Sequence, residues 1–204
     1  MEELCFYGYE FLSSFIPFLI VFIIFIYLSK KKGLSISKTS CVVMGIFMIY
    51  IICVYHVTGT GTLYDMLRLK IQLDSINLIP FSNEIDLIGY FLNIVLFIPL
   101  GFLVQLICKD MNKLKNIFGI GLGFSLLIEL SQLLNYRATD IDDLIFNTIG
   151  AIVGFALYKI FNKCTKSKYQ LNEIPVTIII VSILASFLGQ FLLFNELGLA
   201  NLLY

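Results

Sequence analysis

Residues 125–154, SLLIELSQLLNYRATDIDDLIFNTIGAIVG, decide how this chain folds. The stretch places ionisable and amide side chains within or beside apolar runs that are long enough to cross a membrane. Charge in such a position is costly and is usually kept for a function. The polar residues of the stretch are therefore the first candidates for a site: Glu129, Gln132, Arg137, Asp140, Asp142, Asp143 and Asn147.

The composition is that of a membrane protein. Hydrophobic residues make up 59% of the 204 residues, and the mean hydropathy of +0.92 is far above that of an ordinary soluble domain. Because the chain has no Trp, the interfacial aromatic role falls to its 11 Tyr residues. The formal net charge is zero, so no global field favours a nucleic-acid partner.

Neither a metal site nor a cofactor motif is indicated. The five cysteines are scattered and mostly lie in apolar runs, without CxxC or Cys/His spacing, so they indicate neither a disulfide framework nor a zinc site.

The N-terminus carries Glu2, Glu3 and Glu10 where a cleaved signal would carry Lys or Arg. We therefore expect the apolar run that follows to be a retained membrane span.

Six segments have the ~20 apolar residues that a transmembrane helix needs. They predict an all-α, polytopic helix bundle with spans at roughly 11–29, 40–58, 87–108, 116–135, 141–161 and 174–194. We divide the chain into a first helix with a lysine-rich loop (1–39), a central transmembrane domain (40–161), and a linker with the last helix (162–204).

Positive charge is distributed unevenly among the connections. All but three of the 14 Lys and Arg residues fall in or beside the first, third and fifth connections; the exceptions are Arg68, Lys70 and Arg137. By the positive-inside rule the lysine-rich connections are cytoplasmic, so both termini are predicted to face outward. The turn at 135–140 and the long connection at 59–86 are then external.

The long external connection contains two patterns. After the GTGT turn at 59–62, apolar residues recur at helical spacing in 63–74, which predicts a short amphipathic helix at the outer interface or, equally, an ordinary surface helix. The segment NLIPF (77–81) is too apolar for a free loop and too short to span. We expect residues 76–86 either to dip into the outer leaflet or to cap the bundle.

Three helices bring polar side chains to a common depth. Asn93, Glu129 and Asn147 each lie six or seven residues from an outer helix end, which corresponds to about 9–11 Å along an α-helix. Helical periodicity aligns further polar residues with them, while Asp142 points elsewhere. The arrangement predicts an outward-facing polar pocket with these residues: Asn93, Glu129, Gln132, Arg137, Asp140, Asp143 and Asn147.

Glycines indicate how the helices pack. Gly150 and Gly154 continue the polar stripe of the fifth span and predict a close helix contact, because small residues let membrane helices approach. Gly119 and Gly123 have the same spacing on the fourth span. They are expected to offer its opposite face to another neighbour.

The candidate residues differ in what they indicate. The two asparagines suit hydrogen bonds between helices as well as ligand contacts. Glu129 is harder to explain as structure, because an acid costs roughly 2.5–3.5 kcal/mol at the centre of a span; it either pairs with Arg137 or is protonated and bonded to the amides. Asp140 suits a helix cap, and Asp143, one turn further, is the more suggestive acid. The single histidine, His56, is expected to be interfacial.

Several motifs together resemble the VanZ-like membrane proteins. They are NLIPF (77–81), NIVLFIPLGF (93–102), Glu129-x-x-Gln132, Arg137-x-x-Asp140-x-x-Asp143 and Asn147-x-x-Gly150, and they cover about residues 40–160. The resemblance implies an integral membrane protein of the bacterial cell membrane. The namesake of the family is linked to low-level resistance to teicoplanin-type glycopeptides, and the resemblance implies no established reaction and no cofactor.

Two classes of function follow. The first is a non-enzymatic envelope protein whose pocket binds or shields a membrane lipid, a lipid-linked cell-wall precursor or a lipoglycopeptide antibiotic, with Arg137 clamping a phosphate or carboxylate. The second is an intramembrane enzyme on a lipid or polyprenyl-linked substrate, with Glu129 and Asp143 as acid/base residues or metal ligands. A transporter is disfavoured, because no repeat is visible and the polar residues are confined to the outer half.

Overall fold

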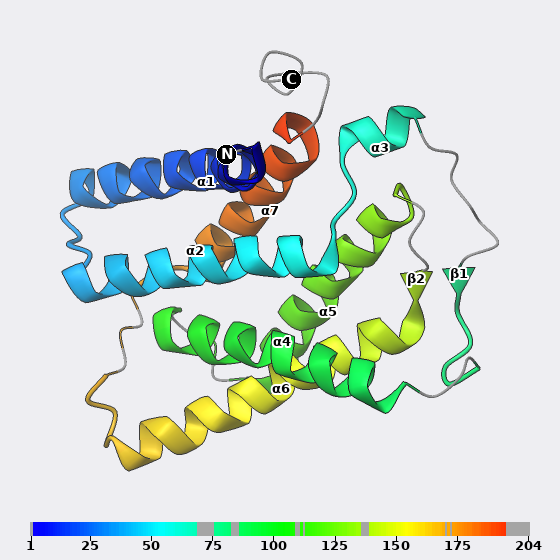
Figure 1. The fold of residues 1–204 in the computed structure, drawn as a ribbon. Coiled ribbons are helices and arrows are strands. Elements are labelled where there is room, and N and C mark those ends of the chain that lie inside the picture. Colours follow the sequence, from blue (N-terminus) through cyan, green and yellow to red (C-terminus); the bar gives the residue numbers. More distant parts are fainter. Residues whose placement is uncertain are drawn as a thin grey trace.

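The computed structural model of the chain describes residues 2–68, 76–82, 86–108, 111, 113–135, 139–169, 171 and 173–194. These residues form helices and two very short strands (Figure 1). In chain order the elements are α1 (Glu2–Lys31), α2 (Lys38–Thr58), α3 (Leu63–Arg68), β1 (Ile76–Asn77), α4 (Leu87–Ile107), α5 (Leu114–Gln132), β2 (Thr139–Asp140), α6 (Ile141–Cys164) and α7 (Val176–Leu193).

Among the described residues, six helices are long and apolar enough to cross a membrane, namely α1, α2 and α4 to α7. This confirms the predicted polytopic helix bundle. The helix ends agree with the predicted spans within a few residues, apart from the start of α1. That helix begins at Glu2 instead of residue 11, because the polar N-terminal residues continue it beyond the apolar run.

Helices α4 and α6 pack closely through small residues (Figure 1). A Cβ added at Gly150 would overlap the carbonyl oxygen of Ile94, and one at Gly154 would overlap that of Ile98. On the α4 side, Gly101 lies in the same way against the backbone of Ala151. The predicted close contact at Gly150 and Gly154 is therefore confirmed, and its partner is α4.

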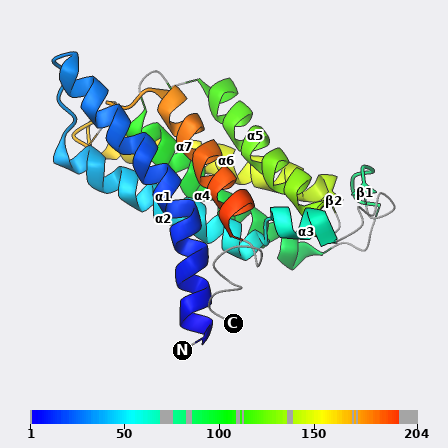
Figure 2. The ribbon, with the colours of Figure 1, turned by 90° about the horizontal axis from the view of Figure 1, so that it is seen from above.

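Helices α1 and α7 form a second pair and lie close together in Figure 2, and Figure 1 shows them at the opposite side of the bundle from α6. A Cβ at Gly189 would overlap the carbonyl oxygen of Ser13 and approach the ring of Pro17. The Tyr9 hydroxyl donates to the Leu193 carbonyl near the ends of the two helices. The first and last spans are thus joined although they are far apart in the sequence.

An aromatic core connects the two helix pairs. Tyr55 of α2 and Phe97 of α4 both contact the ring of Phe124 on α5, with ring centroids 5.9 and 5.5 Å apart. The Tyr55 hydroxyl donates to the Ile183 carbonyl of α7 at 3.0 Å. All three aromatic side chains are buried. Burial of such large rings dominates the energetics of packing, so this core fixes α2, α4, α5 and α7 relative to one another.

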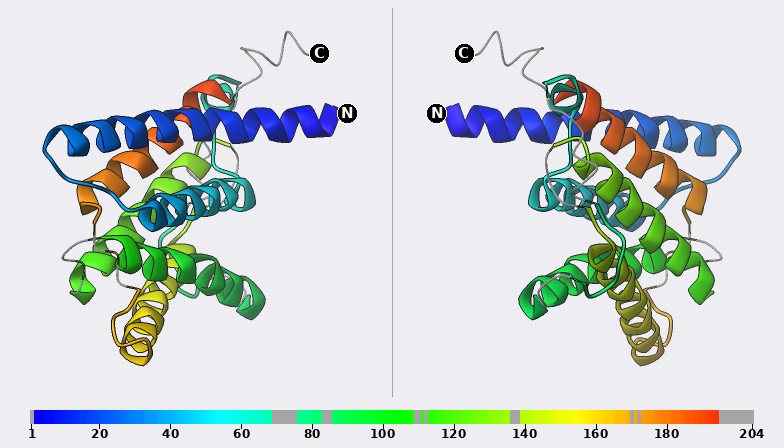
Figure 3. Two further views of the ribbon diagram at one scale, coloured as in Figure 1. Left: turned by 90° about the vertical axis from the view of Figure 1, so that its left-hand side faces the viewer. Right: turned by 90° about the vertical axis from the view of Figure 1, so that its right-hand side faces the viewer.

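The connections gather at two opposite ends of the bundle (Figures 1 and 3). At one end Glu173 accepts a hydrogen bond from the Ser37 amide at 2.8 Å, so the α1–α2 and α6–α7 connections meet. At the other end the Gly61 amide donates to Ser131, and Asn135 donates to the Gly59 carbonyl at 2.7 Å. The described lysines lie in or beside the connections at the first end, so the charge asymmetry of the sequence distinguishes the two ends of the bundle.

Two other expectations need adjustment. The helix predicted in 63–74 is present as α3 over Leu63–Arg68, and the rest of that prediction lies outside the described residues. The expectation that Gly119 and Gly123 contact a neighbour is wrong within the described part of the chain. Both are exposed, and an added Cβ would meet nothing within 4 Å, because α7 stands off from this part of α5.

Candidate functional site

The polar end of α4, α5 and α6 is organised by a two-residue parallel strand pair. Ile76 pairs with Thr139 and Asn77 with Asp140, which ties the segment before α4 to the start of α6. The Asn77 side chain also donates to both carboxylate oxygens of Asp140, at 3.3 and 3.2 Å. Residues 63 positions apart therefore meet at the site.

Asp140 is the N-cap of α6. Its carboxylate accepts from the Asp142 amide at 2.9 Å, which satisfies one of the amides left free at a helix start. Its own backbone amide donates to the Glu129 carboxylate at 3.3 Å. Asp140 thus connects the strand pair to the buried acid of α5.

Glu129 is almost fully buried, with 3% of its surface exposed. One carboxylate oxygen accepts from the Asp140 amide, and its backbone carbonyl accepts from the Thr139 hydroxyl at 3.1 Å. Its carboxylate also interacts electrostatically with that of Asp143. Burying Glu129 beside the partly buried Asp143 is unfavourable, which makes the pair a candidate for function and not for stability.

Asp143 is held from the neighbouring helix α4. The Asn93 side-chain amide donates to the Asp143 carboxylate at 2.6 Å. Asn93, which was predicted to lie at the depth of Glu129, therefore contacts Asp143. Asn93 and Asp143 thereby form a polar bridge across the outer part of the α4–α6 interface.

Asn147 lies one turn further into α6 than Asp143, and Gln132 is the last residue of α5. The Asn147 amide donates to Ser125 at 3.0 Å, and the Gln132 amide donates to the Thr58 carbonyl at 2.8 Å. The side-chain oxygens of both are buried and have no hydrogen-bond partner among the described residues. Buried acceptors are normally satisfied, so these two oxygens are places where a water molecule or a ligand donor would bind favourably.

Asp142 faces a different set of partners, and sequence reasoning missed its role. Its carboxylate, with 1% of the residue exposed, accepts from the Tyr90 hydroxyl at 2.8 Å and from the Phe81 amide at 3.1 Å. Phe81 has a positive φ of 57°, which is strained for a residue with a side chain. Asp142 thus holds the segment 77–82 in place.

An aromatic cluster covers Asp142. The rings of Tyr90 and Phe146 stack at 4.2 Å, and Phe81 meets both edge-on at 6.3 Å. Phe146 follows Asp142 by four residues and so shares its helix face. The four-residue spacing of Asp142 and Phe146, together with Tyr90 one turn into α4, is the sequence pattern that could have predicted this cluster.

Arg137, the cation expected near Glu129, lies outside the described residues, as does Tyr136. The described acids at this end of α4, α5 and α6, N-cap residues included, are Asp86, Glu129, Asp140, Asp142 and Asp143. Within the described ranges, no group of three His, Cys, Asp or Glu side chains is placed to hold a metal ion. The site is therefore rich in hydrogen-bond acceptors, and a ligand that carries cations or hydrogen-bond donors would match it.

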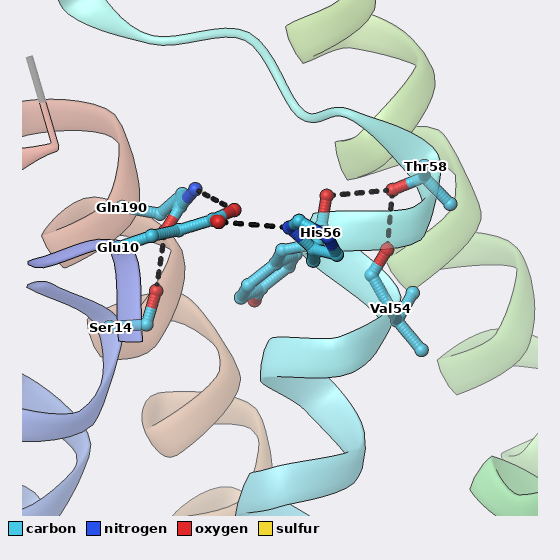
Figure 4. Close-up of polar contacts among 7 residues, drawn as sticks. Glu10, Ser14, Val54, His56, Thr58 and Gln190 are labelled. Carbon is cyan, nitrogen blue, oxygen red and sulfur yellow. Dashed lines mark hydrogen bonds and ion pairs between the residues drawn. The ribbon is translucent and has the colours of Figure 1, made fainter. Parts of the chain in front are cut away.

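A second polar cluster joins α1, α2 and α7, and sequence analysis did not single it out (Figure 4). Glu10 lies 2.8 Å from His56 and accepts from Gln190 at 3.2 Å, while Ser14 donates to Gln190 at 2.8 Å. Half of the His56 side chain is exposed, as expected for an interfacial residue. The cluster fixes the α1–α7 pair to α2 and lies apart from Glu129 and Asp143.

The bundle and its buried acids define a multi-pass helical membrane protein. The VanZ/LLP1 family model matches residues 41–162, which is more than half of the chain. The chain belongs to the VanZ/LLP1 family. Its motifs at 77–81, 93–102 and 129–150 lie within the matched range, whereas α1 and α7 lie outside it.

A curated relative supports the same assignment. The chain is similar to Protein VanZ of Enterococcus faecium, with 30% identity over 126 residues that cover 61% of this chain and 78% of the relative. No solved structure matches the chain.

Proposed function

We propose that this protein resides in the cytoplasmic membrane of a bacterium and uses an outward-facing polar pocket to bind or shield an envelope component. The bound molecule is a lipid-linked cell-wall precursor, a membrane lipid or a lipoglycopeptide antibiotic, and the outcome is low-level resistance of the teicoplanin type. The observation that carries the proposal is the pair of acids, Glu129 and Asp143, each held within a membrane-spanning helix by a hydrogen bond from another element.

The distribution of lysines supports the outward orientation. Lys30, Lys38, Lys115 and Lys163 lie in the terminal turns of α1, α2, α5 and α6 that adjoin the lysine-rich connections, whereas Glu129 lies in the last turn of α5, at the other end of that helix. The positive-inside rule assigns the lysine-rich end to the cytoplasm and the acidic end to the outer face. Lipid-linked precursors and glycopeptides are encountered at this outer face.

The chemistry of the site supports a polar headgroup as the ligand. Carboxylates and the two unpaired amide oxygens accept hydrogen bonds, so they suit the hydroxyl, amide and ammonium groups of sugar–peptide headgroups. We assign Arg137, by its place in the sequence between Glu129 and Asp140, to a phosphate or carboxylate of the same ligand. Leu78, Ile79 and Phe81 are exposed beside the site and suit an acyl chain.

A resistance assay tests the proposal. The chain and its variants are expressed in a susceptible bacterium, membrane levels are matched by immunoblot, and the teicoplanin concentration that stops growth is measured. Glu129→Gln, Asp143→Asn and Arg137→Ala are each expected to remove most of the protection. Glu10→Gln, which alters a buried acid outside the site, is the matched control and should retain it. Undiminished resistance in the Arg137→Ala protein would contradict the ligand-clamping role.

A second candidate is an intramembrane enzyme acting on a lipid or polyprenyl-linked substrate. The electrostatic interaction of Glu129 with Asp143 favours it, because paired carboxylates in unlike surroundings are a common acid/base arrangement. Lipid extracts of cells expressing the wild type or Glu129→Gln would be compared by mass spectrometry. A product that disappears in the variant at equal protein level would support catalysis over binding alone.

A further inference from the structure

A groove of about 510 Å³ runs between α5 and α7, away from the acidic site. The two helices lie side by side there, as Figures 2 and 3 both show. Its floor is formed by Phe124 and Ile183, which are buried, and its walls include Ile180 and Leu184, which are partly exposed. The volume is within the ~300–1,000 Å³ typical of small-molecule sites.

The groove exists because small residues on α5 leave space beside α7. Gly119 and Gly123 line it, and a Cβ at either would meet no described atom within 4 Å. The opening lies between two membrane-spanning helices, so it faces the bilayer. An apolar channel open to the bilayer is filled by an acyl chain, because hydrocarbon and not water surrounds it.

One end of the groove is polar and positively charged. Lys115 and Asn116 line it in the first turn of α5, and Val176, the first residue of α7, lies at the same end. Lys115 forms no ion pair with any residue that the structure describes. Two helix N-termini also present their positive dipole ends there. Basic pockets between membrane helices on the cytoplasmic side are suited to anionic lipid headgroups.

We propose that the α5–α7 groove binds an anionic phospholipid of the bilayer, with its phosphate at Lys115 and an acyl chain along Gly119 and Gly123. The site is separate from Glu129, because Lys115 is 14 residues away on the same helix, about 21 Å at the helical rise. It therefore stands independently of the function proposed for the acidic end.

Native mass spectrometry of the full chain in detergent tests this, with phosphatidylglycerol and phosphatidylcholine of identical acyl chains as probes. The wild type is expected to bind phosphatidylglycerol preferentially. Lys115→Gln should weaken phosphatidylglycerol binding about fivefold and leave phosphatidylcholine binding unchanged, since one lysine near a membrane surface contributes about this much. Gly123→Leu should weaken binding of both lipids by filling the groove.

Two controls match these variants. Lys163→Gln removes an exposed lysine of α6, and Gly45→Leu adds the same bulk at an α2 glycine that also has open space around it. Neither should change lipid binding. Equal binding of both lipids by the wild type, or unchanged phosphatidylglycerol binding in Lys115→Gln, would overturn the proposal. A dimer of the wild type that Gly123→Leu dissociates would also overturn it, by identifying a second copy as the occupant. Lys115→Gln alters only an exposed side chain, so it decides the headgroup contact even if Gly123→Leu folds poorly.

Discussion

Two glycine pairs with the same spacing behave differently in this protein. Gly150 and Gly154 of α6 lie against the backbone of α4, whereas Gly119 and Gly123 of α5 face an open groove. The spacing places both small residues on one helix face in each case. Whether that face is covered depends on how closely a neighbouring helix packs against it: α4 covers the α6 glycines, whereas α7 leaves a groove beside the α5 glycines. The same spacing can therefore lie at a tight helix interface or along an open groove.

The largest expected effect is at the tight pair. Gly154→Leu would force a side chain into the Ile98 carbonyl and should destabilise the protein by ~3 kcal/mol or more, because a backbone contact cannot give way as a side chain can. Thermal unfolding in detergent measures this. Gly119→Leu is the matched control, and comparable losses in the two variants would refute the contrast.

The next effect is at the polar end of the tight pair. Asp142→Asn should weaken the contacts to Tyr90 and to the strained Phe81, at a cost of about 1–3 kcal/mol for buried partners left poorly satisfied. Hydrogen exchange of the Phe81 amide should accelerate. Asp65→Asn, which alters the cap of α3, serves as the control. A protected Phe81 amide in Asp142→Asn would show that the aromatic cluster alone holds the segment.

A smaller effect is expected at the cluster that fixes α1 and α7. Glu10→Gln removes the charge opposite His56 but can keep the hydrogen bond to Gln190, so a loss of only about 0.5 kcal/mol is expected, because the His56 side chain is half exposed. Thermal unfolding measures it. The double variant with His56→Gln should lose little more than Glu10→Gln alone. A loss several times larger would mean that the pair is effectively shielded from water.

The smallest effect is at the open pair. Gly119→Ala should leave stability unchanged or raise it by up to ~1 kcal/mol, because Ala is the better helix former and nothing obstructs its methyl group. Gly150→Ala is the comparison and should destabilise, since its methyl group would overlap Ile94. If both substitutions behave alike, the two glycine faces are equivalent after all.

The sequence was sufficient for features that depend on one helix at a time. The six spans follow from apolar length, and the close contact at Gly150 and Gly154 follows from spacing within α6. The N-cap role of Asp140 also needs only its local context. Composition and periodicity determine such features, because each is set by neighbours within a few residues.

Features that need two distant segments were not predicted. Asp142 was expected to point away from the polar residues, and its partners come from Phe81 and Tyr90, which only the complete fold brings near. The openness beside Gly119 depends on the position of α7, some 60 residues later. The direction of a side chain on its own helix can be read from spacing, but what lies opposite cannot.

The strand pair has a mechanical consequence. Asn77 holds the carboxylate of Asp140, and the amide of Asp140 holds the carboxylate of Glu129, so three segments form one chain of hydrogen bonds. A displacement of the exposed residues in 77–82 would therefore be transmitted through Asp140 to the buried Glu129 on α5. The two-residue ladder thus connects the exposed segment 77–82 to a buried carboxylate of a membrane-spanning helix.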